Sequence, residues 1–145
     1  MLGLGFSVLL TASMFAAETK VTMKDLPAAV QKTVTQETKI AKLRGLEKEI
    51  EHGKTYYEAE TTVNGKSRDI LIDPSGTIVE IEEGVTLESL PAAARSGLKH
   101  SAGTGKILRV ESVTRGSVVS YEAVIERQGK KTEVSVNADG SRTKD

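Results

Sequence analysis

The spacing of hydrophobic residues changes along the chain in a way that predicts two kinds of element. Met23, Leu26, Val30 and Val34 recur at steps of three and four residues, which places them on one face of a helix. From Tyr56 onward the spacing becomes two, which is typical of a strand that is buried on one side. We therefore predict a helix followed by strands, with the helix packed on the apolar face of a sheet.

Turn sequences separate the predicted strands. Asn64-Gly65 favours a two-residue hairpin because both residues accept a positive φ angle. Asp73-Pro74-Ser75-Gly76 has the composition of a second turn. Three or four antiparallel strands should therefore follow the helix. The predicted strands are 43–51, 56–63, a stretch that contains Ile70 and Ile72, and 78–82.

The whole pattern occurs a second time, 64 residues further along. Leu26-Pro27-Ala28-Ala29 corresponds to Leu90-Pro91-Ala92-Ala93, and Tyr57-Glu58-Ala59 to Tyr121-Glu122-Ala123. A unit of about sixty residues buries little surface alone, so the two copies should pack together or share a sheet. We predict an α+β protein of two tandem units, residues 18–84 and 85–145. Each would be an N-terminal helix followed by a three- to four-stranded antiparallel sheet.

The second unit departs from the first at its end. Its helix face is Leu87, Leu90, Ala94 and Leu98, and its predicted strands are 107–113, 118–126 and 131–136. The apolar residues of the strand at 78–82 correspond to Arg142, Thr143 and Asp145. We expect the last strand of the second unit to be short or frayed, with charged residues protecting the sheet edge.

The first seventeen residues are uncharged and apolar, which predicts export. The run from residue 2 to 17 is shorter than the roughly 20 residues of a membrane span, and it ends at Ala16-Ala17. It fits a secretory signal peptide at 1–17, and an uncleaved N-terminal anchor is the alternative. We therefore predict a periplasmic or secreted protein with no stable membrane span after cleavage. No cysteine is present, so disulfides and thiolate metal sites are excluded.

Composition and motifs exclude several classes of function. With 38% hydrophobic and 28% charged residues, the chain fits a folded domain, and its zero formal net charge does not suggest nucleic-acid binding. His52 and His100 stand in polar surroundings and lack the spacing of a zinc site. No serine lies in a nucleophile elbow, and no glycine-rich loop has phosphate-binding spacing. We expect no catalysis and no cofactor.

Several segments, taken in order and spacing, resemble the PepSY-like domain family, in the tandem form grouped with the β-lactamase-inhibitor-like proteins. In the first unit they are Leu26-Pro27-Ala28-Ala29-Val30, Tyr57-Glu58-Ala59, Asn64-Gly65-Lys66 and Asp73-Pro74-Ser75-Gly76; in the second, Leu90-Pro91-Ala92-Ala93, Tyr121-Glu122-Ala123 and Asn137-Ala138-Asp139-Gly140. The resemblance covers about 120 residues. It implies an exported α+β module without catalytic residues that binds proteins, including peptidases, as an inhibitor or regulator.

Alternating glutamates predict an acidic sheet surface in the first unit. They are Glu47, Glu49 and Glu51 on one strand, Glu58 and Glu60 on the next, and Glu80 and Glu82 on the last. Three interpretations remain open. The surface is solvated and balanced by Lys48, Lys66 and Arg68, or it attracts a basic protein, or it holds Ca²⁺ loosely.

The tyrosines divide between the two sheet faces. Tyr57 and Tyr121 fall on the apolar face and should pack in the core, whereas Tyr56 falls among the glutamates. The candidate partner-binding residues are Tyr56, Glu58, Glu60 and Glu122. We predict a non-enzymatic module that binds or regulates another exported protein, such as a peptidase or other envelope enzyme, through its exposed sheet face. The alternative is a small-ligand or divalent-cation sensor or sequestering protein in the cell envelope.

Overall fold

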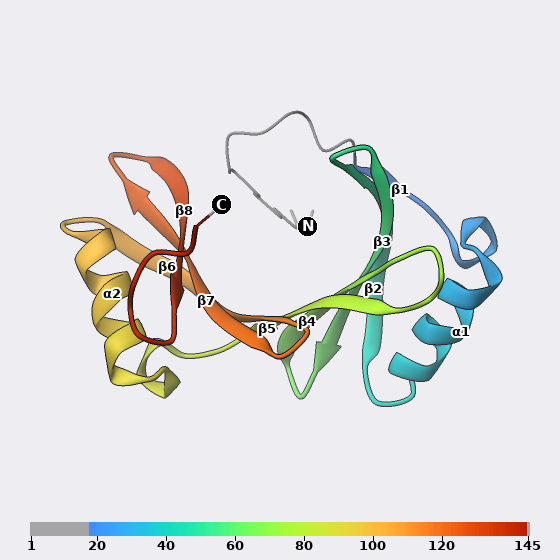
Figure 1. Cartoon of the computed structure of the whole chain (residues 1–145), viewed down its shortest axis with the longest axis horizontal. Coiled ribbons are helices and arrows are strands. Elements are labelled where there is room, and N and C mark those ends of the chain that lie inside the picture. The colour runs from blue at the N-terminus through green and yellow to red at the C-terminus, as the bar shows by residue number, and fades with distance from the viewer. Residues whose placement is uncertain (1–17, 145) are drawn as a thin grey trace.

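The strands form one continuous antiparallel sheet in which neighbours along the chain are neighbours in space (Figure 1). The computed structural model describes residues 18–144, so the predicted signal peptide at 1–17 lies outside the described residues. The sheet has eight strands in the order β1 to β8. Their bounds are β1 Thr19–Lys20, β2 Lys42–Glu51, β3 Lys54–Val63, β4 Lys66–Ile72, β5 Ile78–Gly84, β6 Lys106–Arg115, β7 Val118–Arg127 and β8 Lys130–Asn137.

The predicted fold of two tandem units, each with its own small sheet, is wrong. β5 pairs with β6 across the junction, with Ile81 opposite Thr114 and Gly84 opposite Glu111. This pairing occupies the backbone groups that two separate sheets would have left open at their edges. The result is a mostly β fold with two short helices on one sheet. The two-residue strand β1, which the sequence pattern did not predict, extends the same sheet beside β2.

Both helices begin in the same way. α1 (Ala28–Glu37) and α2 (Ala92–Ala102) each follow a proline and a short 3-10 turn, η1 (Met23–Asp25) and η2 (Leu87–Ser89). Proline suits this position because the first amides of a helix have no acceptor within it. The carboxylate of Asp25 accepts hydrogen bonds from the backbone N and hydroxyl of Thr22, at 2.8 and 2.7 Å, and this fixes the first turn.

Each helix covers its own part of the sheet, on the convex side (Figure 1). Around α1, the buried residues are Leu26, Val30, Val34, Leu46, Tyr57, Ala59, Ile70 and Ile72. Around α2 they are Leu90, Ala94, Leu98, Ala102, Val110, Ala123, Ile125, Val134 and Val136. The predicted helix faces are confirmed in part. Val30 and Val34 are buried on α1, and Ala94 and Leu98 on α2, whereas the residues predicted before them lie in the 3-10 turns or at their ends. The core position of Tyr57 is confirmed, and Tyr121 packs against the second cluster while partly buried. Within residues 18–144, no helix lies on the concave side of the sheet.

Turn glycines dock against the helices. Asn64 and Gly65 both have positive φ, at 50° and 79°, as the hairpin sequence predicted. Gly76 has φ 88°, and a Cβ at this position would stand 2.7 Å from the carbonyl oxygen of Ala29 in α1. The hydroxyl of Thr33 donates a hydrogen bond to the Gly76 carbonyl at 2.6 Å. Glycine at this position therefore allows both the positive φ angle and the close approach of the turn to the helix.

The end of the chain is as the sequence predicted. After β8, only an isolated bridge joins Arg142 to Val136, so the last strand of the second half is almost lost within the described residues. Both His52 and His100 are exposed. Between residues 18 and 144, no helix has the length and apolar character that crossing a bilayer requires.

Candidate functional site

Carboxylates gather on the concave side of the sheet. Residues that lie directly opposite each other on neighbouring strands share a face. Glu47 is paired with Glu58, Asp69 with both Glu60 and Glu82, and Glu111 with Glu122. The alternation along each strand places these residues opposite to the helix-covered core. The acidic residues of this face include Glu47, Glu49, Glu51, Glu58, Glu60, Asp69, Glu80, Glu82, Glu111, Glu122, Glu126 and Glu133.

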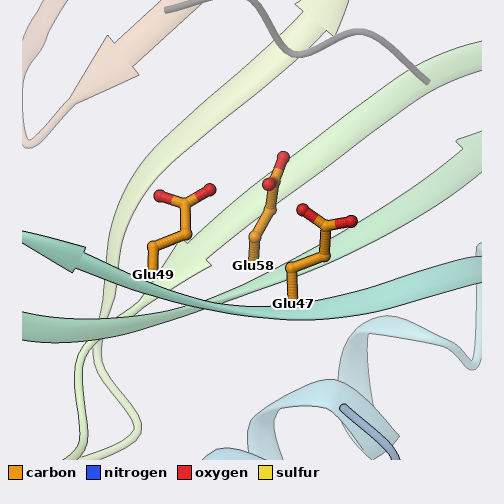
Figure 2. A group of neighbouring side chains, drawn as sticks. All are labelled: Glu47, Glu49 and Glu58. Carbon is orange, nitrogen blue, oxygen red and sulfur yellow. The ribbon is translucent and has the colours of Figure 1, made fainter. Parts of the chain in front are cut away.

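Glu47, Glu49 and Glu58 form the tightest group. One carboxylate oxygen from each lies within 4.8 Å of the others. Figure 2 shows the three side chains rising from β2 and β3 on the same side of the sheet. Hard oxygen ligands in this arrangement are suited to a divalent cation such as Ca²⁺.

Glu58 is the most deeply placed member of this group. It is 7% exposed, and its Oε2 atom has no hydrogen-bond partner within the described part of the chain. Burial, followed by the neighbouring Glu49, raises the pKa of Glu58 to about 10. Burial also raises the pKa of Glu49, which is 5% exposed. This part of the face therefore favours protonation or the approach of a cation.

Three further carboxyl groups on this face have raised pKa values. Burial raises the pKa of Glu111, although the neighbouring Arg109 acts in the opposite direction. Burial and the neighbouring Glu80 raise the pKa of Glu82 to about 9. Burial and the neighbouring Glu122 raise that of Glu133 to about 9 as well. Carboxyl groups with raised pKa values thus occur from β2 to β8 on the concave side.

Arginines balance part of this charge. Arg44 contacts Asp69 at 2.8 Å, Arg109 contacts Glu111 at 3.3 Å, and Arg115 forms an ion pair with Glu80. None of these is a residue that the sequence interpretation had named for this role.

The balancing partners suggested from the sequence, Lys48, Lys66 and Arg68, lie on the helix-covered face instead. Their register shows this, because Lys48 is opposite Tyr57 and Arg68 is opposite Thr61. Arg68 contacts Glu37 of α1 at 2.7 Å. The sequence interpretation failed here because it did not follow the strand register through each hairpin.

The four predicted partner-binding residues lie on the concave face. Tyr56, Glu58 and Glu60 are on β3, and Glu122 is on β7, with three strands between them. Tyr56 is half-buried and lies opposite Glu49. Glu122 accepts a hydrogen bond from the hydroxyl of Ser135 at 2.9 Å. Glu58 exposes too little surface for broad contact, so Tyr56, Glu60 and Glu122 remain the accessible candidates.

Sequence reasoning missed Asp69, Glu111 and Glu133 as members of this face. The 64-residue repeat contained the signal, since Glu47 corresponds to Glu111 and Asp69 to Glu133. Applying the alternation of the first half to the second half would have identified Glu111 from Glu47, whereas Glu133 corresponds to Asp69, which was itself missed. The arginine partners gave no such signal, because Arg109 corresponds to Gly45.

Comparison with known proteins supports the fold. Neither family models nor curated proteins give a match. A solved structure from Bacteroides eggerthii, assigned to the periplasm, is similar with a TM-score of 0.67 and 18% identity, covering 82% of this chain and 86% of that one. A DUF2874 family protein from Bacteroides ovatus gives 0.63 and 18%, covering 82% and 85%. A BLIP-like protein from Bacteroides fragilis gives 0.60 and 17%, covering 82% and 84%.

These similarities place the sheet with its two outer helices among the DUF2874 and BLIP-like structures. At this identity they concern the fold alone.

Proposed function

We propose that this chain is an exported, non-enzymatic module of the PepSY-like type that binds another exported protein through the concave face of its sheet. The observation that carries the proposal is the acidic face itself, which is curved and, within residues 18–144, free of helices (Figure 1). The strand register places carboxylates on it from β2 to β8. The fold similarity to a BLIP-like protein and to a structure assigned to the periplasm supports an exported binding protein without catalysis.

The chemistry of the face selects a basic partner segment. Tyr56 offers a half-buried aromatic ring beside Glu49, and Glu60 and Glu122 offer half-buried carboxylates. A protruding loop rich in Lys or Arg would pair with these groups, and the inward curve of the sheet would surround it. Regulation of an exported peptidase is the concrete form that the PepSY-like resemblance implies.

Affinity capture followed by measurement on the purified partner tests this proposal. The mature chain serves as bait for the envelope fraction of the source cells, beside a Tyr56→Ala/Glu60→Lys variant. Glu88→Lys is the matched control, because Glu88 is exposed in η2, away from the concave face. We expect one basic protein that wild type and control retain, that the double variant loses, and that added salt releases.

Calorimetry with the purified partner then tests whether the concave face is the binding surface. The proposal predicts saturable binding that the double variant weakens by about tenfold or more, as expected for a contact centred on an aromatic anchor. Equal affinity of the double variant and Glu88→Lys would refute the concave face as the binding surface.

A further inference from the structure

Two pairs of glutamates occupy corresponding positions on the concave face. Glu47 of β2 lies opposite Glu58 of β3, and 64 residues later Glu111 of β6 lies opposite Glu122 of β7. Two carboxylates that face each other across neighbouring strands destabilise a sheet unless something offsets their charge. We therefore compare which groups offset the negative charge of each pair.

The second pair is served by the protein's own side chains. The Nη2 atom of Arg109 lies 3.3 Å from a carboxylate oxygen of Glu111. The hydroxyl of Ser135 donates a hydrogen bond to Glu122 at 2.9 Å. A cation and a hydrogen-bond donor thus accompany these two carboxylates.

Among residues 18–144, no arginine or hydroxyl group accompanies the first pair, and Glu58 instead shares a side-chain hydrogen bond with Glu49. Gly45 stands at the position that corresponds to Arg109, and Glu49 stands where the second half has Val113. The first half therefore has a third carboxylate in place of a counter-charge. Within residues 18–144, neither Glu47, Glu49 nor Glu58 forms an ion pair. The Oε2 atom of Glu58, a residue 93% buried, has no hydrogen-bond partner there and belongs to the group of converging oxygens in Figure 2.

We propose that Glu47, Glu49 and Glu58 bind a divalent cation, Ca²⁺ in the first instance, which supplies the charge that Arg109 supplies in the second half. Their oxygens lie within 4.8 Å of one another, and two ligands on opposite sides of Ca²⁺ are separated by about 4.6–5.2 Å. Glu47 is half-buried on the open face, so water completes the coordination shell. Mg²⁺ demands stricter octahedral geometry, and Zn²⁺ favours nitrogen and sulfur ligands.

Strand β1 adds charge of both signs near the group. Glu18, just before β1, has a pKa raised by burial and by the nearby Glu47 and Glu60, so its carboxyl group lies close to the cluster. Lys20 lies opposite Glu47 in the register but is exposed and makes no ion pair among the described residues. Removing this lysine, as in Lys20→Ala, should tighten cation binding.

Calcium titration of the full chain after chelator treatment tests the proposal. Calorimetry and thermal melting with CaCl₂ at pH 7.5 compare wild type with Glu58→Gln and with Glu49→Val, which gives the first half the composition of the second. Glu122→Gln is the matched control, because Glu122 is the residue that corresponds to Glu58. We expect Ca²⁺ to raise the Tm of wild type and control. Both test variants should bind about tenfold more weakly or worse, because each loses a carboxyl oxygen ligand.

A second measurement keeps the result independent of folding defects. Tb³⁺ occupies Ca²⁺ sites and emits when a nearby tyrosine is excited, and Tyr56 lies opposite Glu49. Tyr56→Phe should lower the Tb³⁺ emission and keep the Ca²⁺-induced rise in Tm. No rise in Tm up to about 10 mM Ca²⁺, a concentration above the weak extracellular range, would overturn the proposal. So would an equal rise in Glu58→Gln and Glu49→Val. The proposed protein partner plays no part in these measurements.

Discussion

Ile81 of β5 and Thr114 of β6 lie directly opposite each other in the strand pairing that joins the two halves of the chain. Ile81 also packs against the core cluster beneath α1 and is paired with Ile70 on its other side. The core of the first half is thereby linked through one sheet to the strands of the second half. The chain should behave as one cooperative unit.

Leu98→Ala tests this cooperativity. Leu98 is fully buried beneath α2, so its truncation should destabilise the chain by about 2–5 kcal/mol. We expect a single unfolding transition by calorimetry and faster amide exchange in β3 and β4 as well as in β7 and β8. Two separate transitions, or unchanged exchange in β3 and β4, would show that the halves unfold independently.

Ile70→Ala measures the core of the first half. Ile70 is 0% exposed, and its loss should lower the free energy of unfolding by about 2–5 kcal/mol in urea titration. Ile40→Ala is the matched control, because Ile40 is 73% exposed, and its change should stay within about 0.5 kcal/mol. Similar losses in both variants would contradict the assigned core.

Gly76→Ala separates steric docking from backbone strain. Gly76 and Gly65 have similar positive φ angles, at 88° and 79°. A Cβ at Gly76 would stand 2.7 Å from the Ala29 carbonyl oxygen, whereas a Cβ at Gly65 has open space within 4 Å. Backbone strain should lower the free energy of unfolding by about 1 kcal/mol in Gly76→Ala and in the comparison variant Gly65→Ala. Gly76→Ala should be destabilised clearly more, because of the added steric clash, and urea unfolding measures both values. Equal losses would show that the turn does not dock tightly on α1.

Acid should stabilise the sheet relative to base. Burial, Glu80 and the more distant Glu111 and Glu122 raise the pKa of Glu82 from 4.5 to about 9, and Asp69 lies opposite it. The folded protein therefore binds more protons than the unfolded chain between these two values. The contribution of Glu82 to stability is complete below pH 4.5 and declines as pH rises toward 9. The decline is at most about 1.4 kcal/mol for each pH unit.

Glu82→Gln should flatten this pH dependence. Glutamine keeps the size of the side chain but needs no proton, so the variant should exceed wild type in stability at pH 8 and lose that advantage near pH 5. Urea titrations at both pH values measure the difference, with Glu88→Gln in the exposed turn η2 as control. If the free energies of unfolding of wild type and Glu82→Gln differed by the same amount at pH 5 and pH 8, the raised pKa of Glu82 would be refuted.

Local patterns in the sequence were sufficient for the two helices and for strands β2 to β8, but not for the two-residue strand β1. The three- and four-residue spacing of Leu26, Val30 and Val34 identified α1, and Asn64-Gly65 identified the hairpin. These predictions held because helix faces and tight turns depend on residues close together in the chain. The acidic strand face was also visible, since alternation in one strand requires no knowledge of its neighbours.

The sequence pattern did not predict which arginines and lysines lie beside these carboxylates. Lys48 and Arg68 were assigned to the acidic face, yet the register places both on the helix side. Arg44 and Arg109, which do contact the carboxylates of Asp69 and Glu111, lie next to register shifts in the sheet. A shift of one position moves a side chain to the other face, so facial assignment requires the actual pairing.

The sequence by itself determined two similar sets of helix and strands, a core of small aliphatic residues and a surplus of carboxylates along alternating strand positions. Only the tertiary structure decided that β5 and β6 join these sets into one sheet. It alone placed Glu47, Glu49 and Glu58 together while giving Glu111 its arginine. The physical reason is that periodicity records which face a residue occupies. Strand pairing and burial arise between distant segments, and they set which charges meet and which stay without a partner.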